Sequence, residues 1–454
     1  MAHAPRVNPI AITSTMNQRT IAAAFALAIA SRAHAQADSI PPLSLGDAMR
    51  LAAKQSYPAV AATYRVDQAR ARATEVRSAL LPEVTAIYSD GQRTFNTASF
   101  GLPLPGFDPN GEIIGPVRTI DVRARFLAQL IDPAGVGRYR TARSAASGAV
   151  AEVSVATNQV AAAAANSYVR ALRAEAQVGA RAADSSLAAD LLGIAQRQLS
   201  AGVGVALDVT RARAQLATTR AQLIAARSER DRSRLDLARA LGLSPTVGLI
   251  LRDSLVTTDS AGVPSEDAAI AAALNDRPDL RAAAVATQTA RSAVKAARSE
   301  RLPKLGVFGD NGTTSNTYPN LLGTYTWGVQ LQVPVFEGSR ISAHVQQQVA
   351  GLRDAEARRH DVELQVATDV RGALLDLSSS REQVGAARER VMLGEQELAQ
   401  SRERFRAGVA GNADVITAQL NLDAARSQYI DALAAHELAR VSLARAQGHL
   451  LEMP

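Results

Sequence analysis

Apolar residues recur along this chain with two spacings that alternate in blocks. Alanine- and arginine-rich stretches typical of helices cover residues 44–81, 138–199, 209–241 and 266–302, and much of the chain after residue 335. Between them, apolar and polar residues alternate as in strands, at about 83–95, 118–131, 304–311 and 324–335. At 1.5 Å per residue, residues 138–199 would form a helix roughly 90 Å long. The pattern predicts a mainly α fold with β strands.

A segment of 44 residues occurs twice, at a spacing of 206 positions, with 17 identical residues. The copies are Leu199–Gly242 and Phe405–Gly448. Each opens with Ala-Gly-Val, continues through Asp-Val and ends at glycine, as expected of a hairpin tip and its returning helix. We therefore predict two tandem repeats of helix, strand, strand, long helix and returning helix. They cover residues 36–242 and 266–454, with tips at about 201–208 and 407–414 and a linker over 243–265.

The returning helix of the second copy carries a seam of small residues at every seventh position. These residues alternate with larger ones in the manner of a coiled coil, and small residues allow helices to approach closely. The small residues are Ala418, Ala425, Ala432, Ala439 and Ala446, and the larger ones are Val415, Leu422, Tyr429, His436 and Leu443. The seam predicts close packing of long helices.

The predicted strands have one apolar and one polar face. The apolar candidates are Ile120, Val122, Phe126, Tyr325, Trp327 and Val329, and the polar ones are Asp121, Arg123, Arg125, Gln330 and Gln332. A soluble sandwich would explain the alternation of any single strand. Two separated pairs flanked by very long helices instead suggest a transmembrane barrel, with the apolar set facing lipid and the polar set the lumen. Four strands cannot close a barrel and lipid does not tolerate an open edge, so oligomerisation is required, and a trimer would give twelve strands.

The N-terminal residues have the features of a cleavable signal peptide over residues 1–35. Arg19 precedes the apolar stretch Ile21–Ala30, and Ala33-His34-Ala35 resembles a cleavage site. Met16 is an alternative start. The chain has no cysteine, which excludes a lipidated N-terminal cysteine. We therefore expect an exported protein without a transmembrane helix.

Composition argues against catalysis, cofactors and nucleic-acid binding. Aromatic residues make up only 4% of the chain, and the six histidines show no metal-ligand spacing. We find no nucleophile–base set or phosphate loop, so we predict neither an enzyme nor a cofactor. The net charge of +7 includes three leader arginines, and charges of both signs interleave along the helices rather than forming a basic stripe.

Together these residues resemble the TolC family of bacterial outer-membrane channel proteins. The resemblance is carried by the two tips, Leu199–Val209 and Phe405–Val415, by the Leu-Pro pairs at 81–82 and 302–303, and by Pro334–Gly338 after the last strand. It implies a homotrimer in which a twelve-stranded outer-membrane barrel continues into a periplasmic α-helical coiled-coil barrel. It also implies a passive exit duct of a tripartite efflux pump or type I secretion system. Its partners would be a periplasmic adaptor and an inner-membrane pump or ABC exporter.

The resemblance further implies roles for the tips. Candidate gate residues are Asp208, Asp414, Phe405 and Thr417, and candidate adaptor-docking residues are Gly202, Val203, Gly204, Gly408, Val409 and Gly411. This chain departs from the family pattern at Phe405, Ala410 and Thr417, where some members carry an aromatic hydroxyl, an arginine and a second aspartate. Plain N-capping is an alternative role for the two aspartates. A non-transporting, exported coiled-coil scaffold is the alternative function.

Overall fold

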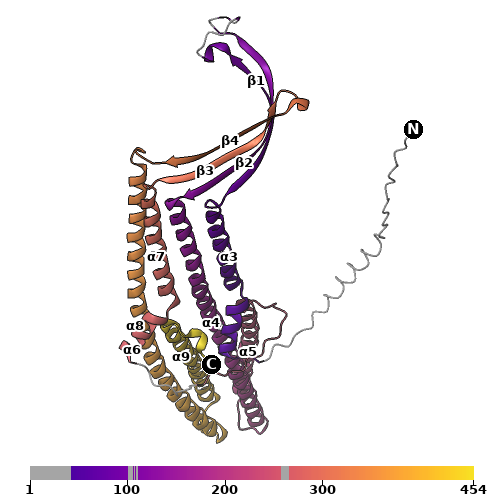
Figure 1. Ribbon diagram of the computed structural model, residues 1–454. Coiled ribbons are helices and arrows are strands. Elements are labelled where there is room, and N and C mark those ends of the chain that lie inside the picture. Colours follow the sequence, from indigo (N-terminus) through magenta and orange to yellow (C-terminus); the bar gives the residue numbers. More distant parts are fainter. Residues whose placement is uncertain (1–41, 101–105, 107, 109–110, 257–264) are drawn as a thin grey trace, which may run out of the picture.

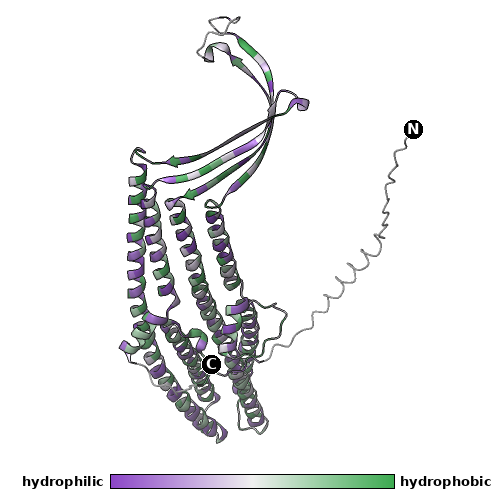
Figure 2. Ribbon diagram, in the orientation of Figure 1, coloured by the Kyte–Doolittle hydropathy of each residue, from purple (hydrophilic) through white to green (hydrophobic). Residues whose placement is uncertain are grey.

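The computed structural model describes residues 42–100, 106, 108, 111–256 and 265–454, and the predicted signal peptide lies outside them. The molecule is elongated, with a curved sheet at one end and long, roughly parallel helices below it (Figure 1). Hydrophobic and hydrophilic residues are interspersed along the strands and helices (Figure 2). Within the described part, no helix is both long and apolar enough to cross a membrane.

Eight α-helices in the described residues follow the predicted repeat. The first repeat contains α2 (Leu45–Gln55), α3 (Tyr57–Ser78), α4 (Pro133–Ser200) and α5 (Ala206–Ala240). The second contains α6 (Glu266–Asp276), α7 (Pro278–Ser299), α8 (Arg340–Arg406) and α9 (Asn412–Gln447). With 68 residues, α4 is about 100 Å long.

The helical stretches 44–81 and 266–302 are each divided in two, a feature the pattern did not predict. Each break places a proline, Pro58 or Pro278, in the first turn of the following helix. Proline is tolerated there because its missing N–H would have no partner in the helix. At the start of α2, Ser44 is the N-cap, and its Oγ accepts a hydrogen bond from the Asp47 N–H at 3.1 Å.

The strands form one antiparallel sheet in the order β1-β2-β3-β4. Their bounds are Glu83–Asn96, Ile113–Ile131, Lys304–Ser315 and Leu322–Gln332, and three short 3₁₀ helices follow β1, β3 and α9, at Thr97–Phe100, Tyr318–Asn320 and Leu450–Glu452. β4 ends three residues earlier than predicted, just before Val333-Pro334, since proline has no N–H for the ladder. The pairing of β2 with β3 joins the two repeats in a single sheet.

The helices form a single layer whose order changes along its length. Next to the sheet the order is α3, α4, α7, α8, and at the far end it is α5, α4, α9, α8 (Figure 1). The five alanines of the predicted seam on α9 are all buried, as are Val415, Leu422, His436 and Leu443. The seam therefore packs α9 against its neighbours within one chain, as its spacing predicted.

Overpacking this seam should destabilise the protein. Ala425 is buried, whereas the adjacent Ala424 is exposed on the same helix. We expect Ala425→Leu to cost about 1–3 kcal/mol, because the neighbouring helices must move apart to accommodate the larger side chain. The thermal midpoint of the detergent-solubilised protein measures this effect, and Ala424→Leu is the matched control. Equal midpoints for the two variants would show that the seam is loosely packed.

Candidate functional site

The two hairpin tips share one backbone geometry. After α4, the Val203 N–H donates to the Gln198 carbonyl at 3.0 Å, and Gly202 has a positive φ of 76°. After α8, Gly408 has φ 73° and the equivalent hydrogen bonds are present. This is a Schellman termination, whose left-handed residue is usually glycine because a side chain would be strained there. The repeated Ala-Gly-Val sequence thus encodes the two turns.

Exposed apolar side chains surround both turns. Val203 is 79% exposed and Val409 68% exposed, and Val205 and Leu207 are also exposed. Such residues gathered at one end of a molecule are typical of a contact surface. Of the candidate docking glycines, Gly202, Gly408 and Gly411 are exposed. Gly204 is half-buried, and a Cβ there would lie 2.9 Å from the backbone of Gln198.

The candidate gate aspartates are not N-caps. Asp208 and Asp414 are each the third residue of their helix, while Val205 and Gly411 occupy the N-cap positions without a side-chain capping bond. The N-capping alternative is therefore wrong for both. An acid in the first turn still interacts favourably with the helix dipole. Asp208 is half-buried and Asp414 exposed, as is Thr417, whose hydroxyl donates to the Ala413 carbonyl at 3.0 Å.

Phe405 does not behave as an exposed gate residue in this chain. Its side chain is buried in a cluster with Val209, Leu398 and Val415, because it occupies a buried position of the α8 heptad. Its carbonyl oxygen instead joins the two hairpins by accepting a hydrogen bond from Gln198 Nε2 at 3.0 Å. The Phe405 side chain is thus a packing residue within one chain, and its part in a gate stays a prediction.

A second hydrogen bond also joins the tips, from Asn412 Nδ2 to the Asp208 carbonyl at 3.0 Å. The Asn412 side chain is fully buried. Sequence reasoning missed both tip contacts. The only available signal was a pair of amide side chains, Gln198 and Asn412, on either side of the doubled turns. These bonds hold the α4–α5 hairpin against the α8–α9 hairpin.

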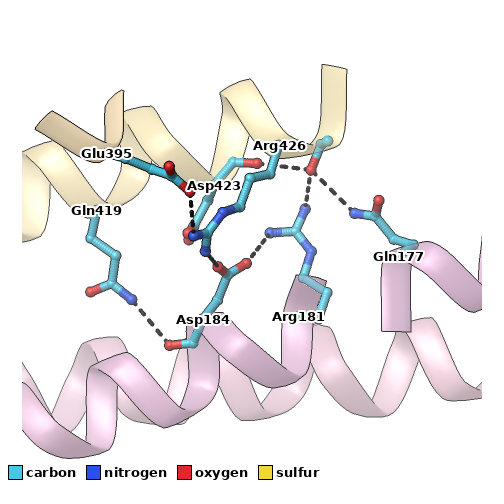
Figure 3. A network of polar contacts seen from close by, with 8 residues as sticks. Gln177, Arg181, Asp184, Glu395, Gln419, Asp423 and Arg426 are labelled. Atoms are coloured by element: carbon cyan, nitrogen blue, oxygen red, sulfur yellow. Dashed lines mark hydrogen bonds and ion pairs between the residues drawn. The ribbon is translucent and has the colours of Figure 1, made fainter. Parts of the chain in front are cut away.

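Further from the tips, a partly buried ionic network links α4, α9 and α8 (Figure 3). The Asp184 carboxylate on α4, only 1% exposed, binds Arg181 Nη1 at 3.5 Å and Arg426 Nη1 at 3.3 Å. Arg426 also binds Glu395 of α8 at 3.2 Å. Gln419 Nε2 donates to the Asp184 carbonyl at 3.2 Å. No motif marked this network, since its members are far apart in the sequence.

Asp423 on α9 lies in this network and is also buried (Figure 3). Burial, and then the hydrogen bond and negative charge of Asp184, raise the pKa of Asp423 from 3.8 to about 7, although Arg181 and Arg426 oppose the shift. Near neutral pH, Asp423 is therefore partly protonated at the contact between the two hairpins.

The sheet separates the two candidate sets of strand residues. Cross-strand register aligns Phe126 with Gly309 and Trp327, so the apolar candidates share one face and the polar candidates lie on the other. On the polar face, Arg123 binds Asp121 at 2.7 Å (Nε to Oδ1) and Asp310 at 3.1 Å (Nη1 to Oδ1). Of the remaining candidates, Val122, Tyr325 and Val329 are exposed on the apolar face, and Arg125, Gln330 and Gln332 are exposed on the polar face.

Ile120 differs from the other apolar candidates because it is fully buried. Its cross-strand partner Asp90 binds Arg118 at 2.8 Å, and the Arg118 guanidinium lies 5.3 Å from the Tyr318 ring centroid. This polar and aromatic group occupies the surface next to Ile120. A lipid contact is therefore not retained for Ile120. Among the described residues, no group of three or more His, Asp or Glu side chains could hold a metal ion.

Comparison with known proteins places these features in a wider context. The family model described as outer membrane efflux protein matches residues 49–243 and 269–449. Alkaline protease secretion protein AprF of Pseudomonas aeruginosa is 25% identical over 78% of this chain and 73% of its own length. Pyoverdine export outer membrane protein OpmQ of Pseudomonas putida is 24% identical over 89% of this chain and 85% of its own.

Solved channel structures share the fold. The CmeC outer membrane channel of Campylobacter jejuni superposes with a TM-score of 0.75 at 18% identity, covering 89% of this chain and 86% of CmeC. The outer membrane protein VceC of Vibrio cholerae gives 0.73 at 16% identity, covering 89% of this chain and 96% of VceC. The resemblance found in the sequence is thus confirmed.

The buried Asp423 predicts a pH-dependent stability. Its pKa is higher in the folded protein than the ordinary value of 3.8, so between about pH 4 and 7 the folded state binds more protons than the unfolded state. Stability should therefore fall as pH rises through this window, and the contribution is lost above pH 7. We expect the thermal midpoint of Asp423→Asn to decline less than that of the wild type between pH 5 and 8.

Asp361→Asn, at an exposed position of α8, is the control for removing one carboxylate. If the midpoints of the wild type and Asp423→Asn differ by the same amount at every pH, Asp423 does not titrate in this range.

Proposed function

Because this chain belongs to the outer membrane efflux protein family, we propose that it is the outer-membrane channel of a tripartite efflux pump or type I secretion system. The observation that carries the proposal is a sheet with two open edges, continuous with helices about 100 Å long that end in apolar tips. In this role the protein is a passive duct. The energy for transport comes from inner-membrane partners.

The sheet supplies one third of a membrane barrel in this proposal. β1 and β4 each pair on one side only among the described strands, which leaves backbone N–H and C=O groups unsatisfied at both edges. Lipid cannot satisfy these groups, so copies of the chain must pair edge to edge. Three copies give twelve strands, with Phe126 and Trp327 facing lipid and Arg123 facing the lumen. A scaffold without a membrane role would leave the exposed apolar face unexplained.

The helical layer forms the wall of the periplasmic tunnel, and its tips form the mouth. Val203 and Val409 offer apolar contacts for a periplasmic adaptor at the Schellman turns. The contacts of Gln198 and Asn412 hold the hairpins together when the mouth is closed. Asp208, Asp414 and Thr417 lie beside these contacts, where their side chains influence which ions pass.

Reconstitution tests the proposal directly. Protein extracted from outer-membrane fractions should form oligomers that conduct ions across planar lipid bilayers. The conductance should increase when the tips are released by Gln198→Ala combined with Asn412→Ala, since each substitution removes one hydrogen bond between the hairpins. A soluble periplasmic protein without conductance would overturn the proposal.

The two tip aspartates should influence ion selectivity. We expect Asp208→Ala combined with Asp414→Ala to reduce cation preference without preventing assembly, because both substitutions remove negative charge at the mouth. The reversal potential in a salt gradient measures the change, and Asp361→Ala, far from the tips on α8, is the control. An unchanged reversal potential in the assembled double variant would limit the aspartates to their favourable placement at helix starts.

A further inference from the structure

The helical layer of one chain has two free sides. At the tip end, α5 packs along α4 and α8 packs along α9, while α4 and α9 lie between them. α6 packs against the middle of α8, but between that contact and the tips neither α5 nor α8 has a helix on its outer side within the described residues (Figure 1). If copies of the chain close into a barrel as proposed above, α5 of one copy meets α8 of the next. The side chains on these two free sides then determine the fit.

The free side of α5 is apolar with an arginine border. Its buried positions, such as Val209 and Leu216, face α4, whereas Ile224 and Leu235 are exposed on the outer side. Arginine recurs at every seventh residue between these two sets: Arg213, Arg220, Arg227 and Arg234. Arg234 binds Glu175 of α4 at 2.7 Å. The other three are exposed, and no described residue forms an ion pair with them.

The outermost row of α8 is acidic, and exposed arginines such as Arg388 and Arg390 flank it. Val384, Ala387 and Leu398 are buried against neighbouring helices. On the opposite side of α8, the residues at every seventh position are Glu382, Glu389, Gln396 and Glu403. Glu403 binds Arg406 in its own helix at 2.9 Å. Glu382 and Glu389 are exposed and have no ion-pair partner among the described residues.

The two charged rows also lie at matching distances from the tips. The contacts of Gln198 with Phe405 and of Asn412 with Asp208 place both tips at one level, and rotation about the barrel axis preserves that level. Glu389 lies 17 residues before the end of α8. Arg220 and Arg227 lie 14 and 21 residues after the start of α5. In antiparallel helices with the same rise per residue, Glu389 therefore falls between the two arginines, and Glu382 falls between Arg227 and Arg234.

We propose that α5 of one copy packs antiparallel against α8 of the next copy, with Arg220 pairing with Glu389 and Arg227 with Glu382 across the seam. The inference rests on the proposed channel function. The apolar residues beside the rows, Ile224 on α5 and Met392 on α8, pack in the same seam. The charges fix the vertical register of adjacent copies, because a shift along the helix axis would separate the opposite charges.

Charge reversal and restoration test the pairing. Glu389→Arg places like charges across the seam and should lower the temperature at which the detergent-solubilised oligomer dissociates. Adding Arg220→Glu to this variant should recover most of the loss. Asp190→Arg is the matched control: Asp190 is an exposed acid on α4, which is flanked on both sides within one chain. This substitution makes the same change of charge at a similar distance from the tips and should leave the dissociation temperature of the oligomer unchanged.

Three outcomes would overturn the seam. One is a Glu389→Arg oligomer as stable as the Asp190→Arg control. Another is a weakened oligomer that Arg220→Glu does not restore. The third is a stable oligomer that loses binding of the periplasmic adaptor, which would assign the face to that partner instead. Failure of the proposed function is distinguishable, because the wild type would then form neither oligomers nor channels.

Disulfide crosslinking is a second test, because the chain has no cysteine of its own to interfere. Ala221→Cys on α5 and Met392→Cys on α8 lie 15 and 14 residues from the tip ends of their helices. Oxidation of the double variant should join copies covalently into a closed oligomer, whereas each single variant should remain uncrosslinked. Crosslinking confined to single chains would contradict the arrangement.

Discussion

The open edges of the four-stranded sheet are the constraint on which the remaining structure depends. Backbone N–H and C=O groups at the outer sides of β1 and β4 need partners, and a lipid bilayer provides none. In the proposed channel, edge-to-edge pairing of identical chains would satisfy them and turn the apolar strand face outward. Because the helices continue from the ends of the strands, the same proposed assembly would bring α5 of one copy beside α8 of the next. The sheet thus determines how the helical layer closes.

The two duplicated hairpins of the helical layer are held by two kinds of contact. Small residues such as Ala425 allow the helices to lie close together, which makes the seams stiff and sensitive to volume. Polar contacts at Gln198, Asn412 and Asp184 join one hairpin to the other towards the tips. Separating the hairpins requires breaking these polar contacts and the apolar cluster in which Val209 meets Phe405 and Val415. The apolar seams within each hairpin can remain packed, so the hairpins are suited to move as units.

Features with a strong period could be predicted from sequence. The alternating strands, the Ala-Gly-Val turns and the alanine seam depend on local geometry, and the structure contains all of them. Burial could not be predicted where tertiary contacts decide it. Phe405 is buried because the α8 heptad turns it inward, and Ile120 is buried beside a polar and aromatic group. The Asp184–Asp423 network could not be predicted, since its residues meet only after two distant helices pack.

The number of chains in the conducting particle tests the central claim most directly. Native mass spectrometry of the protein in lipid nanodiscs would measure that number after conductance has been shown for the same preparation. Pairing of open sheet edges into a twelve-stranded barrel predicts a mass of three chains. A conducting particle with one or two chains would contradict the account, because at most eight of these strands would then have to close the barrel.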